Sequence, residues 1–227
     1  QVLRRDVVIT LPDDLLVFYL AQVRNVWEWW KANQGESRAR RGLWRLVKAS
    51  TYPERYGWTG PNPVLEAVVS EARPGDVVFV KYKDFGMRLA SLLRARLIHG
   101  GIPLKRRIRV IEEFRRNPES HILIGTYGTI AEGYDIPEAK RVILAEPSWD
   151  AIEVIQATGR LMRPGRTSPE VEQVVVYALG TAAHYAFQLV DIKLKNIRAL
   201  ASGIDQSERK PSHGDMLMAL VARANLL

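Results

Sequence analysis

Short apolar runs alternate with amphipathic stretches between residues 74 and 179. The runs are rich in β-branched and aliphatic residues, and we predict a strand at each of five: 76–81, 96–98, 121–125, 141–145 and 173–177. Between them, apolar residues recur every three or four positions, which predicts helices near 86–95, 104–116 and 150–162. Strands that alternate with helices form a parallel sheet covered by helices. The pattern therefore predicts an α/β doubly wound fold.

The flanks of this region are helical in character. Residues 15–60 contain a tryptophan-rich helix and a basic stretch, and they look like a helical insertion before the sheet. A Gly/Pro/Asn-rich joint closes the insertion, and we expect Asn62 to cap the helix that leads into the sheet. After the sheet we expect a helix at 183–201, a polar loop and a helix at 215–226. The predicted domains are a lead-in with insertion (1–62), the α/β lobe (63–182) and a C-terminal helical brace (183–227).

Length and composition describe a globular chain that can bury a core. Of its 227 residues, 47% are hydrophobic and 26% are charged. No apolar run approaches the ~20 residues that span a bilayer, and no signal peptide opens the chain. We expect an intracellular protein, cytoplasmic or associated with the nucleoid or nucleus. The first residue is Gln rather than Met, which suggests a piece of a longer polypeptide, although a processed N-terminus would look the same.

Charge and the metal-ligating residue types narrow the function further. The formal net charge is +8, which favours an anionic partner such as nucleic acid, but arginine-rich thermostable proteins have a similar balance. The chain has no cysteine, and its four histidines are far apart in sequence. We therefore predict no metal site within the chain.

A segment with two arginines follows the fourth predicted strand. It runs QATGRLMRPGR from Gln156, and Arg160 and Arg163 are three residues apart on the predicted helix. Guanidinium groups so placed share a face and can stabilise charge on the γ-phosphate of a nucleotide held by another domain. The alternative is an exposed basic helix end that complements the helix dipole.

A glycine-rich segment, GTYGTIAEGYDIPEA, follows the third predicted strand and runs from 125 to 139. Its glycines permit tight turns that bring backbone amides near a phosphate, and its Thr126 hydroxyl can bond to one. A carboxylate such as Asp135 can accept a hydrogen bond from a ribose hydroxyl. The alternative is an ordinary glycine-rich loop between a strand and a helix.

These segments, in this order, resemble the conserved motifs of superfamily 2 helicases and translocases. The segment at 156–166 resembles motif VI and that at 125–139 resembles motif V. Weaker matches are HGGIPLKRR at 99–107, similar to the segment after motif IV, and AEPSWD at 145–150, similar to the loop before motif VI. The resemblance covers about 100 residues and implies a RecA-like C-terminal helicase lobe.

The resemblance also implies roles for individual residues. Arg160 and Arg163 would act in catalysis, and Gly133, Asp135 and Gln156 would contact the nucleotide. The expected nucleic-acid contacts are Lys81, His99, Arg107, Thr126 and Tyr127.

Two branches of the superfamily remain open. Leu3-Arg-Arg followed by Leu11-Pro12, the Pro-Ser-Trp-Asp run from 147 and Tyr177-Ala-Leu-Gly resemble the Swi/Snf-type DNA translocases, whose C-terminal lobe carries a helical insertion. The EGYDIP run from Glu132 and the Gly159-Arg pair look more like helicases of the branch-migrating, repair and restriction kind. We favour the Swi/Snf type, and with it duplex DNA as the partner.

The inserted region contributes two further expectations. Arg38 and Arg41 belong to a basic stretch that also contains Trp44 and could clamp a duplex backbone, unless the stretch is a solvated helix face whose tryptophan packs inward. The tryptophans at 27, 29 and 30 are expected in the core or on a lobe-packing surface, since aromatics at helical spacing are more often buried than binding.

The sequence lacks part of the apparatus for ATP hydrolysis. No Gly is followed by Lys and no Asp by Glu, so the phosphate-binding loop and the acidic pair for Mg²⁺ are missing. We therefore expect ATP and Mg²⁺ to be held mainly by a first RecA-like lobe of the same polypeptide, and this chain alone to be inactive and monomeric. The alternative is a catalytically inactive nucleic-acid-binding or adaptor module. A dinucleotide-dependent enzyme is disfavoured, because no Gly-x-Gly-x-x-Gly follows the first predicted strand.

Overall fold

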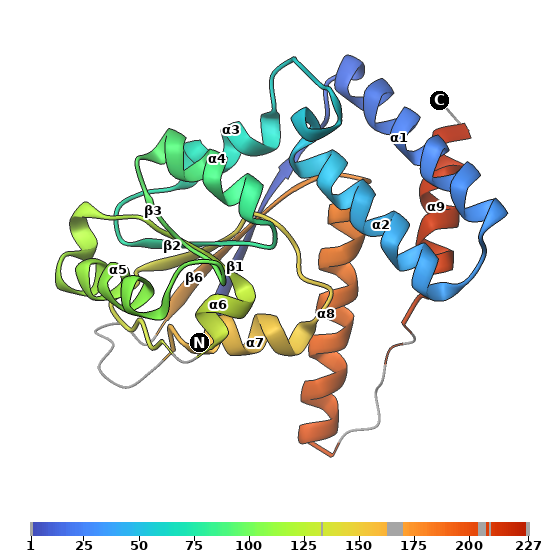
Figure 1. The fold of residues 1–227 in the computed structure, drawn as a ribbon. Coiled ribbons are helices and arrows are strands. Elements are labelled where there is room, and N and C mark those ends of the chain that lie inside the picture. Colours follow the sequence, from blue (N-terminus) through green and yellow to red (C-terminus); the bar gives the residue numbers. More distant parts are fainter. Residues whose placement is uncertain (1, 133, 163–169, 204–207, 209, 226–227) are drawn as a thin grey trace. The chain divides into compact units, whose positions relative to one another are not determined.

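The chain forms two compact units in a computed structural model that describes residues 2–132, 134–162, 170–203, 208 and 210–225. The first comprises residues 1–7 and 65–176, and we call it the sheet unit. The second comprises residues 8–64 and 177–227, and we call it the helical unit. The chain thus enters the helical unit twice, before and after the α/β core (Figure 1).

A six-stranded sheet organises the α/β part of the molecule. Its order is β1-β6-β5-β2-β4-β3, and parallel ladders join β3 to β4, β4 to β2, β2 to β5 and β5 to β6. The strand order reverses along the chain, as in a doubly wound sheet. The bounds of the strands are β1 Val2–Ile9, β2 Asp76–Val80, β3 Arg96–Ile98, β4 Leu123–Thr126, β5 Arg141–Leu144 and β6 Val171–Ala178.

Helices cover both faces of the sheet. Figure 1 shows α3 and α4 above it and α5, α6 and α7 below it, as right-handed crossovers between these strands require. The covering helices are α3 Pro63–Glu71, α4 Lys83–Leu93, α5 Leu104–Arg116, α6 Tyr127–Ala131 and α7 Ala151–Gly159, with a 3-10 turn, η2, at Pro118–Ser120. Because both faces are covered, every residue of the central strand β2 is buried.

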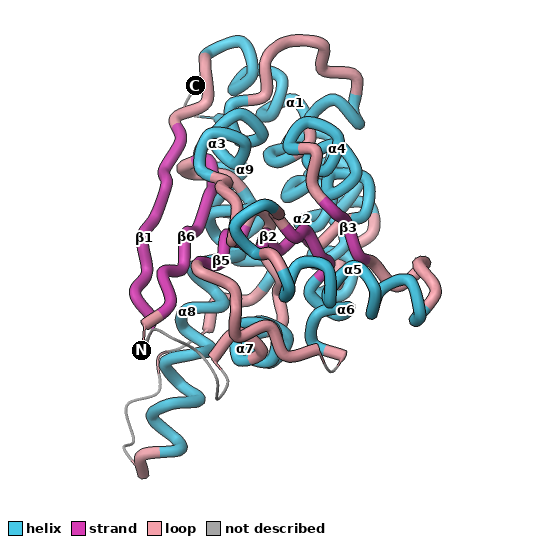
Figure 2. Tube along the Cα trace, turned by 90° about the vertical axis from the view of Figure 1, so that its left-hand side faces the viewer, coloured by secondary structure: helices cyan, strands magenta, loops and turns pink. Residues whose placement is uncertain are grey.

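The described part of the helical unit contains four helices, labelled in Figures 1 and 2, and a short 3-10 turn, η1, at Pro53–Tyr56. Helix α2 contacts α1, α8 and α9, and α1 also packs on α9. The Tyr19 hydroxyl on α1 accepts a hydrogen bond from the Ala182 N–H at 2.8 Å, which fixes the start of α8. The helices are α1 Asp13–Ala32, α2 Glu36–Thr51, α8 Ala182–Ala201 and α9 His213–Asn225.

The predicted α/β fold and its five strands are confirmed, with ends that differ by at most two residues. Strand β1, helix α6 and the 3-10 turns η1 and η2 were not predicted. Strand β1 lies at the sheet edge and its residues are mostly exposed, so it lacks the apolar run that marks a buried strand. Helix α6 has five residues and falls inside the glycine-rich segment that we had interpreted as a loop.

The expectation that Trp27, Trp29 and Trp30 are core residues holds only in part. Trp27 stacks on Trp30 with ring centroids 5.3 Å apart, and both are half-buried. Trp29, between them in sequence on the same helix, is 41% exposed. The helical period placed these residues on a helix but could not say which of them a neighbour would cover.

Candidate functional site at the carboxyl edge of the sheet

Four strands of the sheet unit deliver side chains to one edge. Lys81 follows β2, His99 follows β3, Thr126 ends β4 and Glu146 comes soon after β5. Because these strands are parallel, their carboxyl ends meet at the same edge, where doubly wound sheets bind ligands. The structure therefore brings together the predicted residues Lys81, His99 and Thr126.

A buried carboxylate holds the end of β2 to the end of β5. Glu146 is fully buried, and its Oε2 accepts hydrogen bonds from the backbone N–H groups of Lys81 at 3.0 Å and Tyr82 at 2.9 Å. Such charge-assisted bonds compensate the desolvation of the carboxylate. Sequence patterns did not identify Glu146 as a positioning residue, since its partners are backbone atoms 64 and 65 positions away in the chain.

The side chain of Lys81 is also held. Its Nζ lies 2.7 Å from Glu153 Oε2 on α7, and the Ser148 hydroxyl donates to the same carboxylate oxygen. About a quarter of the Lys81 side chain is exposed (27%), so its ammonium is oriented by Glu153 and still reaches solvent. This arrangement presents one fixed cation at the edge.

Tyr127 was predicted to contact nucleic acid, but its side chain has no exposed surface in the structure. Its side chain is fully buried, its ring stacks on Phe79 at 5.1 Å, and its hydroxyl donates to the backbone oxygen of Glu146 at 2.7 Å. Burial, with the nearby carboxylates of Glu146 and Glu153, raises the pKa of Tyr127 well above its ordinary value. With no exposed surface, Tyr127 serves the core, and we omit it from the nucleic-acid contacts.

His99 and Thr126 present neutral polar groups at the same edge. The Nδ1 of His99 accepts the Gly101 N–H at 3.0 Å, which leaves Nε2 as the protonated nitrogen and donor. Burial and the cations Lys83 and Arg107 lower the pKa of His99 below its ordinary value, so the ring is neutral at neutral pH. The Thr126 hydroxyl lies 2.8 Å from that of Thr129, one turn into α6.

Arg107 comes from α5 and meets the glycine-rich segment. Its Nη1 lies 2.9 Å from Glu132 Oε2, and only 13% of the Arg107 side chain is exposed. Its Nε is buried and has no hydrogen-bond partner among the residues that the structure describes. Arg107 is thus joined to the 125–139 segment but offers little free surface in this conformation.

Arg160 connects the two segments that the sequence singled out. It follows the last residue of α7, and its Nη1 and Nη2 donate to Asp135 Oδ1 at 3.3 Å and to the Ala131 backbone oxygen at 3.0 Å. The carbonyl of Arg160 in turn accepts the Ile136 N–H at 2.9 Å. The guanidinium is oriented by these contacts, and Asp135 remains about half exposed.

Gln156 lines an open cavity between α6 and α7. The cavity has a volume of about 460 Å³, and its lining includes Gly128 and Ala131 as well as the acidic side chains Glu132, Asp150 and Glu153. The carboxyl edge of the sheet thus combines the oriented cations Lys81 and Arg160 with an adjoining polar cavity. The remaining predicted nucleotide-site residues, Gly133 and Arg163, lie outside the described residues.

Arg38 and Arg41 belong to the helical unit and are not part of this edge cluster. Both are exposed on α2, and the Arg38 Nη1 donates to the Asn33 backbone oxygen at 2.8 Å. Within the described ranges, no group of three or more His, Cys, Asp or Glu side chains is placed to hold a metal ion. In the same part of the chain, no helix is long and apolar enough to cross a membrane.

Comparisons with known proteins show what the α/β part of the chain resembles. Residues 63–165 match the family model described as the helicase conserved C-terminal domain. A protein of Haloarcula marismortui named as a Rad25 DNA 3'-5' helicase is 28% identical over 127 residues, which is 56% of this chain and 19% of that protein. The chain therefore spans about a fifth of the length of this curated relative.

Solved structures share the fold. The SWI2/SNF2 ATPase core of Sulfolobus solfataricus, in complex with double-stranded DNA, superposes with a TM-score of 0.65 at 19% identity, over 99% of this chain and 49% of that one. The C-terminal part of the Fun30 ATPase domain superposes with a TM-score of 0.63 at 13% identity, over 83% of this chain and 88% of that one. Residues 63–165 therefore resemble the helicase conserved C-terminal domain, and the chain shares its fold with these Swi2/Snf2 ATPase structures.

Proposed function

We propose that this chain is the second motor lobe of an ATP-dependent DNA translocase or helicase, and that it completes an ATP site carried mainly by a first RecA-like lobe of the same polypeptide. The observation that carries the proposal is Arg160. Its guanidinium is held at the carboxyl edge of the sheet by Asp135 and Ala131, beside the cavity that Gln156 lines. A family match over 63–165, which includes both arginine positions, supports it.

In this proposal Arg160 donates to the γ-phosphate oxygens across the cleft between lobes, and Arg163 supplies the second guanidinium. Positive charge at that point stabilises the charge that develops during phosphoryl transfer. The fit is reasonable, because Asp135 and Ala131 orient the guanidinium while a quarter of the Arg160 side chain stays exposed. An arginine that is already oriented loses less conformational entropy when it meets a phosphate.

ATP, when bound, supplies the phosphoryl transfer that drives opening and closure of the cleft. Asp135 accepts from the ribose hydroxyl, and Gln156 and Gly133 complete the contacts from this lobe. The Mg²⁺ ligands and the phosphate-binding loop belong to the first lobe, since this sequence has neither the Gly-Lys nor the Asp-Glu pair.

Nucleic acid is bound at the strand ends of the same unit. Lys81 and Arg107 contribute positive charge, and the His99 Nε2–H and the Thr126 hydroxyl donate to phosphate oxygens. Because both lobes hold the same nucleic acid, each cycle of closure moves the protein along it. We favour duplex DNA because the Sulfolobus SWI2/SNF2 core, which shares this fold, was solved with double-stranded DNA.

The test is ATP turnover by the chain joined to its first lobe, with duplex DNA, with single-stranded DNA and without DNA. We expect Arg160→Ala to lower DNA-stimulated turnover by roughly a thousand-fold or more, as loss of an arginine finger does. Arg115→Ala is the matched control, since Arg115 is an exposed arginine on α5 paired with Glu138. Unchanged turnover in the Arg160 variant would overturn the proposed role.

The DNA form that stimulates turnover separates the remaining possibilities. Stimulation by duplex supports translocation on double-stranded DNA, and stimulation by single strands alone supports a strand-separating helicase. Absence of turnover in every condition, with DNA binding retained, would leave the nucleic-acid-binding or adaptor module as the better account. The chain without its first lobe should hydrolyse no ATP in any of these assays.

A further inference from the structure

Helix α2 carries a row of cations along one side. Arg38, Arg41, Arg45 and Lys48 follow one another at intervals of three, four and three residues, which places them on one face of the helix. At about 1.5 Å of rise per residue the row is about 15 Å long. Along one strand of a duplex, phosphates recur about every 3.4 Å of axis, and an unpaired strand spaces them more widely, so the row is long enough to face more than one phosphate of either.

The arginines of this row are not neutralised within the described part of the chain. None of the carboxylates there forms an ion pair with Arg38, Arg41 or Arg45. Glu36, the acidic residue of α2, is engaged by His213, whose backbone N–H and Nδ1 both contact its carboxylate. Arg38, Arg41 and Arg45 therefore present positive charge that no carboxylate of the described residues pairs, and this favours an anionic partner.

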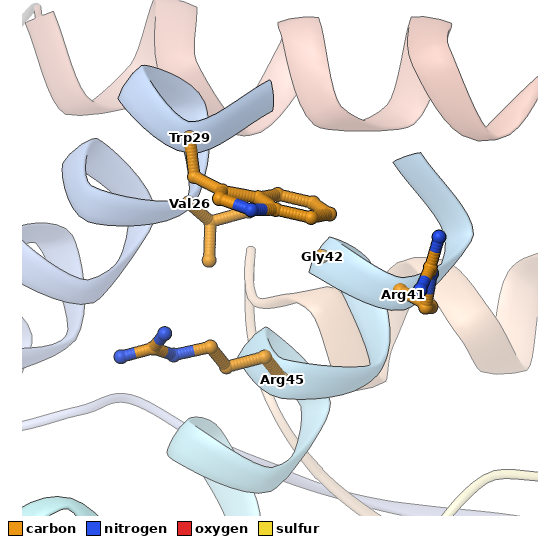
Figure 3. Close-up of a pocket in the computed structure, with 5 residues that line it drawn as sticks. All are labelled: Val26, Trp29, Arg41, Gly42 and Arg45. Carbon is orange, nitrogen blue, oxygen red and sulfur yellow. The ribbon is translucent and has the colours of Figure 1, made fainter. Parts of the chain in front are cut away.

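An aromatic pocket opens beside the row. Trp29 from α1 is 41% exposed and, with Val26, Arg41, Gly42 and Arg45, lines a cavity of about 190 Å³ (Figure 3). Figure 3 shows the indole plane on one side of the hollow and the Arg45 guanidinium on the other. At about 30 Å³ for each water in the liquid, the cavity has room for about six waters, which suits a planar heterocycle better than a single ion.

Gly42 helps to form this pocket. A Cβ at position 42 would lie only 2.6 Å from Val26 Cγ1, so the close approach of α1 and α2 depends on glycine there. Arg45 is oriented by a second ring, since its guanidinium lies 5.5 Å from the centroid of Tyr56. A flat aromatic surface and oriented guanidinium groups are thus held on two packed helices.

We propose that α1 and α2 bind an unpaired nucleic-acid strand, with a base stacked on Trp29 and the adjoining phosphates on Arg38, Arg41 and Arg45. Base stacking on an exposed aromatic ring, flanked by cations that follow the backbone, is the general mode of single-strand binding. A duplex could use the cations but not the pocket, because its bases are already stacked on one another. The site lies wholly in the helical unit and does not depend on the ATP-site proposal.

The test is fluorescence anisotropy of the 227-residue chain, without nucleotide, against a labelled oligothymidylate of about twelve residues and a hairpin duplex of matched charge. We expect Trp29→Leu, which keeps apolar volume but removes the ring, to weaken single-strand binding roughly ten-fold, and Trp29→Phe to retain most of it. Duplex affinity should change less than two-fold in both variants. Equal losses for Leu and Phe, or an equal loss on duplex, would overturn the stacking role.

The row of cations has its own matched control. Arg41→Gln and Arg45→Gln should each reduce the slope of log affinity against log salt by about 0.7 for the single strand. Arg40→Gln removes the same charge from an exposed position of α2 that lies off the row, and it should change the slope by less than half as much. Equal effects at 40, 41 and 45, or equally strong competition by polyglutamate, would reduce the surface to non-specific charge and overturn the proposal.

Two further measurements distinguish a variant that no longer folds from one that folds but no longer binds. Far-UV circular dichroism and the melting temperature report whether each variant folds, and Trp29→Phe keeps the test interpretable if Trp29→Leu does not. Because binding is measured without ATP, failure here would leave the Arg160 turnover experiment untouched. Failure of that experiment would likewise leave this site standing.

Discussion

Arg5 and Arg141 of the sheet unit and the arginines of helix α2 are used in opposite ways. In the sheet unit, Arg141 donates two hydrogen bonds to the buried carboxylate of Asp76 and one to the Glu71 backbone, and Arg5 bonds to both Glu71 and Glu172. On α2, Arg41 and Arg45 project from a helix with no carboxylate partner in the described residues. The first set fixes strands to each other, whereas the second is available to a ligand.

The largest expected effect comes from breaking a buried pair. Arg141→Ala leaves the Asp76 carboxylate, which is 1% exposed, without its guanidinium partner, and we expect a loss of about 3–5 kcal/mol in the free energy of unfolding. Urea denaturation followed by circular dichroism measures it. The matched substitution Arg41→Ala, on α2, should change that free energy by no more than about 0.5 kcal/mol. Similar losses in the two variants would show that Arg141 and Arg41 do not differ in their contribution to stability.

A smaller effect tests whether the packing of α2 against α1, rather than the charges of α2, holds α2 in place. Gly42→Ala puts a methyl group against Val26, and we expect it to destabilise the chain by about 1–3 kcal/mol. The double substitution with Val26→Ala should recover part of the loss, because it removes the clashing Cγ1. The same thermal or urea denaturation reports both variants. A fully additive double variant would show that the contact at Gly42 is not the cause.

The smallest effect is the dependence of stability on pH that Glu71 contributes as a partner of Arg5. The hydrogen bond from Arg5 lowers the pKa of Glu71 below its ordinary value. The resulting stabilisation is therefore present above the ordinary pKa of Glu and is lost as pH falls through the lowered value. Between pH 6 and pH 3 the wild-type chain should lose slightly more stability than Glu71→Gln. A variant with the same pH dependence as the wild type would contradict this assignment.

The sequence predicted the buried strands better than the edge of the sheet. Val77 to Val80 form an uninterrupted apolar run because helices cover both faces of β2, and burial on both faces is what such a run reports. β1 has Arg4, Arg5 and Asp6 at its centre, and it is held in the sheet by pairing with β6 and by the ion pairs of Arg5. Pairing between segments 165 residues or more apart leaves no local signature.

The candidate site was predictable where side chains act directly and not where they act through backbone atoms. Motif spacing identified Arg160 and Asp135, which the structure brings within 3.3 Å. It also selected Tyr127, whose hydroxyl is used inside the core, and it passed over Glu146, whose partners are two backbone N–H groups. Whether a tyrosine faces outward depends on the element packed over it, and a single sequence does not report that packing.

Glu146 has a mechanical consequence for the edge that it holds together. The segment after β2 begins with Lys81, and its first two N–H groups are fastened to a carboxylate that belongs to the segment after β5. A force applied at Lys81 is therefore shared between two adjacent central strands, which resist shear together, instead of peeling one loop away from the sheet. The Glu146 hydrogen bonds therefore make the sheet edge at Lys81 stiffer than the end of a single strand would be.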